Sequence, residues 1–281
     1  MRRMDVFVFC AVLGAAFLHA AWNALIKTGV SKVTSMLIMT LVQGGFGVAI
    51  AATRALPAPE VIGWLIASGL FHAGYKLFLA FAYEQGDLSR VYPIARGAAP
   101  LIVTVISALL VIDVIRGMEY LAIAILGLGI ALMARGVFTS GESRRLVPLA
   151  LGSAAMTAGY SLVDGLGARV SGDAVMYVAW LFVLDAVLFT PTLMVLRGPG
   201  VFRASRKDWA VGALAAAASY GAYAIAVWAM TQAPIALVTA LRETSILFAV
   251  LIGWLVMGDR MDRTKALAAA LIVAGVIASR L

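Results

Sequence analysis

The chain has 281 residues, of which 63% are apolar and only 13% are charged, and its mean hydropathy is +0.99. A soluble domain of this size carries about 25% charged residues, so the composition excludes the soluble globular, fibrous, disordered and disulfide-stapled classes. The net charge of +8 could suggest a nucleic-acid partner, but most basic residues lie between apolar runs, where lipid headgroups favour them, so no nucleic acid is expected.

Ten apolar runs of about 20 residues follow one another, and a helix of that length spans a hydrocarbon core of roughly 30 Å. The runs cover residues 5–26, 33–53, 61–83, 90–112, 118–138, 147–168, 174–196, 208–230, 234–257 and 263–280. They are about twice as long as barrel strands and do not alternate, so the sequence predicts an all-α membrane protein with ten transmembrane helices. The first run is too long for the apolar region of a signal peptide, and we expect a retained first helix.

An internal repeat relates the two halves of the chain. Arg96 matches Arg242 at an offset of 146 residues, and the same offset pairs Asp113 with Asp259 and Gly129 with Gly275. Because each repeat has five helices, an odd number, the second repeat would enter the membrane from the opposite side. We therefore expect two inverted five-helix repeats, at residues 1–140 and 141–281, with a binding site near the midplane between them.

Three features of the chain resemble the drug/metabolite transporter superfamily in its EamA-type ten-helix form. The first run carries Trp22, Asn23 and Lys27. Twice, an apolar helix ends in an acidic residue and is followed by a helix that contains glycine. These segments are Pro100 to Asp113 then Gly127-Leu128-Gly129, and Ile246 to Asp259 then Gly275.

The resemblance implies a multi-pass secondary carrier of the cell inner membrane, similar to the YddG-like amino-acid exporters. It also implies that both termini lie inside the cell. The distribution of basic residues favours the opposite. Of the 22 Lys and Arg residues, 13 lie on the side of the membrane opposite the termini, six lie on the side of the termini and three lie within runs, and the side with more basic residues tends to face the cytoplasm. The orientation therefore stays open at the level of sequence, as does the choice between monomer and homodimer.

Ionisable side chains within apolar runs are candidates for function, because an unpaired charge in the hydrocarbon core is costly. Six lie within the runs: Lys76, Arg96, Asp164, Asp185, Arg242 and Glu243. Three cations and three anions suit a zwitterionic ligand. They could equally form structural ion pairs, for example between Arg96 and either Asp164 or Glu243.

The third run carries a polar and aromatic stripe at helical spacing, made of Ser68, His72, Tyr75, Lys76, Leu79 and Tyr83. Such a stripe in a lipid-embedded helix is expected to face inward, toward water or a ligand. Similar faces occur in four further runs. The substrate-binding candidates are Trp22, Asn23, His72, Tyr75, Lys76, Leu79, Tyr83, Tyr92, Arg96, Tyr160, Asp164, Tyr223, Arg242 and Glu243. The proton-coupling candidates are His19, Asp164, Asp185 and Glu243.

These features favour a secondary transporter, in the export direction, of small amino-acid-like zwitterionic or anionic metabolites by alternating access. One alternative is efflux of drugs or lipophilic cations, and another is a carrier of organophosphate or phosphonate anions. We do not expect an enzyme, because a Gly-x-Ser-x-Gly setting is absent. Without a Cys/His metal motif or a nucleotide-binding phosphate loop, neither a metal nor a cofactor is expected, and the single Cys10 can form no internal disulfide.

Overall fold

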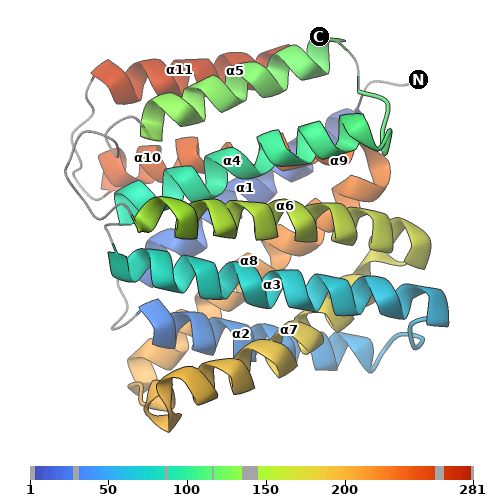
Figure 1. Cartoon of the computed structure of the whole chain (residues 1–281), viewed down its shortest axis with the longest axis vertical. Helices are drawn as coiled ribbons and strands as arrows, with labels where there is room; N and C mark the ends of the chain where they lie inside the picture. Colours follow the sequence, from blue (N-terminus) through green and yellow to red (C-terminus); the bar gives the residue numbers. More distant parts are fainter. Residues whose placement is uncertain are drawn as a thin grey trace.

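The computed structural model describes residues 4–27, 32–85, 88–115, 117–134, 145–256 and 263–279, and these residues form an all-helical bundle (Figure 1). The helices of the first half are α1 (Val6–Lys27), α2 (Lys32–Ala51), α3 (Pro59–Gln85), α4 (Leu88–Leu109) and α5 (Gly117–Ala134). Those of the second half are α6 (Leu146–Ser171), α7 (Ala174–Arg197), α8 (Arg206–Gln232), α9 (Ile235–Arg242), α10 (Ser245–Val256) and α11 (Arg263–Ala278), with a 3-10 turn η2 (Pro199–Phe202) after α7.

Among the described residues, helices cover most of each predicted run, but the expectation of one continuous helix over 234–257 is wrong. This run is two helices, α9 and α10, separated at Glu243 and Thr244. The backbone N–H groups of these two residues donate to the carbonyls of Ala240 and Leu241, three residues back, and the Thr244 hydroxyl also donates to the Leu241 carbonyl at 2.7 Å. These tighter bonds replace the α-helical pattern. Broken helices in transporters often border binding sites, which directs attention to Arg242 beside the break.

Six segments among the described residues are long and apolar enough to cross a bilayer: Val6–Leu25, Val33–Ala51, Pro59–Leu79, Ala174–Arg197, Arg206–Gln232 and Ile235–Ile252. Shorter apolar helices cover Ala98–Leu109, Gly117–Leu132 and Ala266–Ala278. The helix α6 is 26 residues long but carries several polar side chains on one face. This polar helix packs along α3, inside the bundle.

The helix bounds repeat at the offset that the sequence suggested. Adding 146 to the bounds of α3 gives 205–231, against Arg206–Gln232 for α8. The same shift moves α4 onto 234–255, against 235–256 for α9 and α10 together. The packing repeats too, because α3 contacts α6 and α7 as α8 contacts α1 and α2.

The contact between α5 and α11 is reciprocal (Figure 1). A Cβ on Gly129 would lie 3.0 Å from the Ala268 carbonyl oxygen and 2.8 Å from Ile272, and a Cβ on Gly275 would lie 3.1 Å from the Ala122 oxygen and 2.7 Å from Leu126. The offset of 146 exchanges each contact with the other. The pairing of early residues of one helix with late residues of the other also makes the two helices antiparallel, as expected for inverted halves.

We expect Gly129→Ala and Gly275→Ala to destabilise the protein equally. Each added methyl group would overlap the facing helix, and such overpacking costs about 1–3 kcal/mol. A fall in the thermal midpoint of the purified protein would measure this loss. The matched control is Gly117→Ala at the start of α5, where nothing lies within 4 Å of the added Cβ. Unchanged midpoints for both glycine variants would contradict the close contact.

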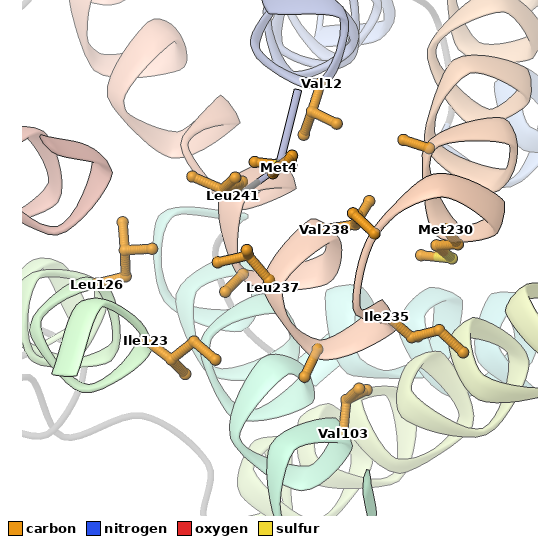
Figure 2. Close-up of a cluster of buried hydrophobic side chains, with 14 of the residues drawn as sticks. Met4, Val12, Val103, Ile123, Leu126, Met230, Ile235, Leu237, Val238 and Leu241 are labelled. Carbon is orange, nitrogen blue, oxygen red and sulfur yellow. The ribbon is translucent and has the colours of Figure 1, made fainter. Parts of the chain in front are cut away.

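Figure 2 shows the apolar core around α9. All eight residues of α9 are buried. Leu237 and Leu241 belong to one cluster with Val12 of α1 and Val103 of α4. The same cluster includes Leu126 of α5. Helices from both halves thus enclose α9, so Arg242 at its C-terminal end is placed by packing rather than by a mobile loop.

A network of hydrogen bonds ties the two halves together at the ends of α6 and α8. The Arg169 side chain of α6 donates to both carboxylate oxygens of Asp113, at 2.9 and 3.3 Å. It also donates to the carbonyls of Met230 and Ala233, at 2.8 and 3.0 Å. Ile235 is the first residue of α9, and its backbone N–H donates to the Asp113 carboxylate at 2.8 Å.

We expect Arg169→Ala to lower the free energy of unfolding by about 1.5–3 kcal/mol, because a charge-assisted network is lost and two carbonyls and a carboxylate lose a donor. The measurement is thermal or denaturant unfolding in detergent. Arg54→Ala is the matched control, because Arg54 is bound to Asp173 at 3.2 Å in an exposed pair and its loss should cost under about 1 kcal/mol. Equal stability of the two variants would show that the network contributes no more than a surface pair.

Candidate functional site

Asp164 of α6 is the centre of a buried polar cluster between α3, α7 and α8. The side chain is fully buried. His72 Nε2 of α3 lies 3.0 Å from its Oδ2. The Tyr223 hydroxyl of α8 donates to the same oxygen, and the Tyr177 hydroxyl of α7 donates to Oδ1 at 3.2 Å. Three helices therefore supply partners to one carboxylate, and both of its oxygens are engaged.

A glycine makes the Tyr177 contact possible. A Cβ on Gly167 would lie only 2.6 Å from the Tyr177 hydroxyl oxygen and ring, so the phenol lies flat against α6 because no side chain is there. From that position the hydroxyl reaches Asp164. The same helix carries Gly159, where a Cβ would lie 2.4 Å from the Phe71 ring of α3. Glycines on α6 thus set the close approach that brings the cluster together.

Four aromatic rings lie together above this carboxylate. His72 and Tyr160 stack, with ring centroids 4.1 Å apart and an interplanar angle of 18°. Tyr75 packs edge-on against Tyr160 at 5.6 Å. Tyr223 packs edge-on against both Tyr160, at 5.8 Å, and His72, at 5.3 Å. The rings come from α3, α6 and α8, and they face one another rather than lipid.

Arg242 brings a cation to the same aromatic cluster. Its guanidinium lies over the Tyr223 ring, 5.4 Å from the centroid, and its Nη2 donates to the Tyr160 hydroxyl at 3.3 Å. Glu243 follows at the break between α9 and α10 and is fully buried. One cluster therefore combines a carboxylate, a guanidinium and four aromatic rings. A guanidinium fork binds carboxylate or phosphate, and aromatic faces beside an acid attract ammonium groups.

A second buried charge pair lies one helical turn along α3. Lys76 Nζ donates to Asp185 Oδ2 of α7, and it donates to the Thr40 hydroxyl of α2 at 2.6 Å. The side chains of Lys76 and Asp185 are 5% and 1% exposed. This pair is a structural ion pair of the kind weighed from the sequence. The example named there, Arg96 with Asp164 or Glu243, depends on a side chain outside the described residues.

Apart from Lys76 and Asp185, which pair with each other, and Glu243, which is buried at the break after α9, the predicted site residues fall into three groups. His72, Tyr75, Tyr160, Asp164, Tyr223 and Arg242 are brought together in the cluster. Trp22, Asn23 and His19 contact one another on α1, where Trp22 packs in a separate core cluster with Met39, and Leu79 is buried in a further apolar cluster with Phe189. The side chains of Tyr83, Tyr92 and Arg96 lie outside the described residues.

Two polar partners were not among the candidate site residues. Tyr177 lies in the first turn of α7 and shares a helical face with Asp185, and the spacing of a Tyr and an acid eight residues apart was the signal for it. Thr40 had only a weak signal, because a lone Thr in an apolar helix more often bonds its own backbone. Its role depends on α2 approaching α7, where a Cβ on Gly44 would lie 2.6 Å from Ala186 Cβ.

The chain is similar to known proteins in two comparisons. Residues 145–281 match the model of the EamA-like transporter family. A solved crystal structure superposes on the chain with a TM-score of 0.78, covering 98% of both chains at 20% sequence identity, and at that identity the likeness shows the fold alone. No curated protein sequence matches the chain. The second half therefore resembles the EamA-like transporter family, and the apolar helices indicate a multi-pass membrane protein.

Proposed function

We propose that this chain, whose residues 145–281 match the EamA-like transporter family, is a secondary active exporter of small amino-acid-like metabolites that carry both charges or a negative charge. Transport proceeds by alternating access between two inverted halves, at residues 1–140 and 141–281. The export direction rests on the family resemblance. The choice of substrate class rests on the cluster around Asp164.

A single observation carries the substrate class: Arg242 and Asp164 both contact Tyr223. The guanidinium of Arg242 lies over the Tyr223 ring, and the carboxylate of Asp164 accepts a hydrogen bond from the Tyr223 hydroxyl. A zwitterion placed here would bind its carboxylate to the Arg242 fork and its ammonium near Asp164. The rings of His72 and Tyr160 would then cover its apolar part.

Lys76 is not part of this substrate contact in our proposal. Its ammonium is already bound to Asp185 and Thr40, so its charge is neutralised within the bundle. Arg242 is a cation that lies over a ring of the aromatic cluster. One cation and one anion in one cluster match a zwitterion better than a doubly charged anion, which would lie against Asp164.

Two features support alternating access between inverted halves. The reciprocal contact of α5 and α11 through Gly129 and Gly275 is what a pseudo-two-fold axis would produce. The break between α9 and α10 also has no counterpart in α4, which runs unbroken from Leu88 to Leu109. The break therefore makes the two halves unequal beside Arg242, where a substrate would bind.

The test is counterflow of radiolabelled amino acids into proteoliposomes that contain the purified protein. We expect at least one amino acid to exchange faster than into protein-free liposomes, and we expect Arg242→Ala to reduce that exchange by about 10- to 150-fold. Arg206→Gln, an exposed residue at the start of α8, is the matched control and should exchange as the unchanged protein does. If no amino acid exchanges, or if Arg242→Ala exchanges normally, the proposed function is wrong.

A second candidate function is efflux of lipophilic cations, because four rings beside Asp164 would also attract a cation and because Asp185 neutralises Lys76. The Arg242 guanidinium opposes it by adding positive charge to the same cluster. Tetraphenylphosphonium in the same liposomes distinguishes the two functions. Its transport, enhanced by Arg242→Ala, would favour the cation efflux function, whereas exchange of inorganic phosphate would favour a carrier of phosphate-type anions.

A further inference from the structure

The Lys76–Asp185 pair is deeply buried, with side chains 5% and 1% exposed, and it lies outside the aromatic cluster. Asp185 Oδ2 accepts from Lys76, whereas Oδ1 is buried with no hydrogen-bond partner in the structure. Phe189, one turn along α7, faces the ammonium with its ring centroid 5.2 Å from Nζ.

The pair also has no mate in the other half. The interface of α3 with α7 repeats in the packing of α8 on α2. At the offset of 146, Lys76 corresponds to Ala222 and Asp185 to Met39, both apolar and buried. The partner of the pair, Thr40, corresponds to Ala186. If alternating access exchanges the packing of the two interfaces, only one of them has a charge pair to break.

We propose that Asp185, paired with Lys76, is the proton-binding site that couples transport to the pH gradient; this rests on the proposed function. One proton from water adds to a carboxylate oxygen of Asp185, the ion pair becomes a neutral acid beside a lysine cation, and no electrons move. That state has a net positive charge in the bundle. It is stable only when α3 and α7 part and water reaches Lys76. Protonation therefore favours the conformation in which this interface is open, and opening in turn favours protonation.

The other titratable groups near α7 are less suited to this role. On the elements packed against α7 they are His72 on α3, Asp164 and Tyr160 on α6, and Tyr220 and Tyr223 on α8. α2 presents Thr40, which does not titrate. Asp164 has three partners covering both oxygens, and it lies among the rings that would bind the substrate. Asp185 contacts Lys76 and is apart from those rings.

The transport arm of the test compares exchange with accumulation in proteoliposomes, using the amino acid with the fastest counterflow. For one proton per substrate, a gradient of one pH unit supports about a tenfold concentration ratio of substrate, because one pH unit is a tenfold ratio of proton activity across the membrane. We expect the unchanged protein to approach this ratio. We expect Asp185→Asn to give a ratio of about one while its counterflow stays within about threefold. Accumulation by Asp185→Asn equal to that of the unchanged protein would overturn the proposal, and so would an unchanged protein that ignores the gradient.

A second variant covers a failure of Asp185→Asn to fold, which an unneutralised Lys76 could cause. Lys76→Met combined with Asp185→Leu removes both charges, and it should also exchange substrate without accumulating it. The control is Asp173→Asn, an exposed carboxylate at the start of α7, which should leave accumulation intact. Loss of accumulation in the control alone would overturn the assignment to Asp185.

A substrate-independent arm separates this proposal from the proposed function. Hydrogen exchange of the purified protein between pH 5 and pH 8, corrected for the intrinsic pH dependence of amide exchange, should show lower protection in α3 and α7 at the lower pH. The variant with Lys76→Met and Asp185→Leu should not show this pH dependence. If no amino acid is transported but the pH dependence disappears with the pair, the proposed substrate is wrong and the proton site stands. If the pH dependence persists in that variant, the proton site is wrong.

Discussion

Replacing Arg242 by alanine is expected to reduce amino-acid counterflow by about 10- to 150-fold. The estimate corresponds to about 1.5–3 kcal/mol, the range for hydrogen bonds to a charged group. The guanidinium has two roles, since it lies over Tyr223 and donates to the Tyr160 hydroxyl. Without it, a substrate carboxylate would enter a buried cluster whose nearest charge is Asp164. The measurement is the initial rate of counterflow against substrate concentration.

Two further substitutions separate the roles of Arg242. Arg242→Lys keeps the charge but loses the planar fork, so it should recover only part of the rate. Tyr160→Phe removes one hydrogen bond and keeps the ring that stacks on His72, so its loss should be smaller than that of Arg242→Ala. If Tyr160→Phe is as damaging as Arg242→Ala, the role of Arg242 is to position Tyr160. If Arg242→Lys transports as the unchanged protein does, a point charge suffices.

The second large effect concerns stability and the Lys76–Asp185 pair. Replacing Lys76 by Met, or Asp185 by Leu, should lower the free energy of unfolding by about 3–5 kcal/mol, because each leaves an uncompensated charge in the bundle. Replacing both together should restore most of that loss, since two apolar side chains of similar volume pack without a desolvation cost. Unfolding in mixed detergent micelles, followed by circular dichroism, gives the four free energies of the cycle.

The exposed pair of Arg54 and Asp173 is the reference cycle, with an expected coupling of under about 1 kcal/mol. If the loss of unfolding free energy in the variant with both substitutions equals the sum of the two single losses, Lys76 and Asp185 do not form a direct buried pair. A coupling similar to that of the exposed pair would show that water reaches the interface of α3 and α7.

The fold was predictable because apolar runs and their breaks depend on local composition. The offset of 146, inferred from a few residues, also matches the helix bounds over most of the chain. The break between α9 and α10 was not predictable, because Glu243 and Thr244 are tolerated within helices and the break depends on where Glu243 is buried. The proposal that both halves are inverted repeats now rests on geometry as well as on sequence.

The candidate site was predictable in its residue types but not in its pairings. Helical spacing placed His72 and Lys76 on one face of α3, and that face is buried. The spacing could not show that these two neighbours contact acids on different helices, Asp164 on α6 and Asp185 on α7. It also could not show that Leu79, on the same stripe, packs in an apolar cluster. Partners from distant segments depend on how helices cross, which a single sequence does not encode locally.

The most direct measurement of the central claim compares three forms of one transported amino acid as competitors of counterflow: the free amino acid, its methyl ester and its N-acetyl derivative. The ester lacks the carboxylate that Arg242 would bind, and the acetylated form lacks the ammonium that Asp164 would attract. If the cluster binds both charges of a zwitterion, only the free amino acid competes strongly. Equal competition by the methyl ester would contradict that claim, because the cluster would then recognise a cation and not a zwitterion.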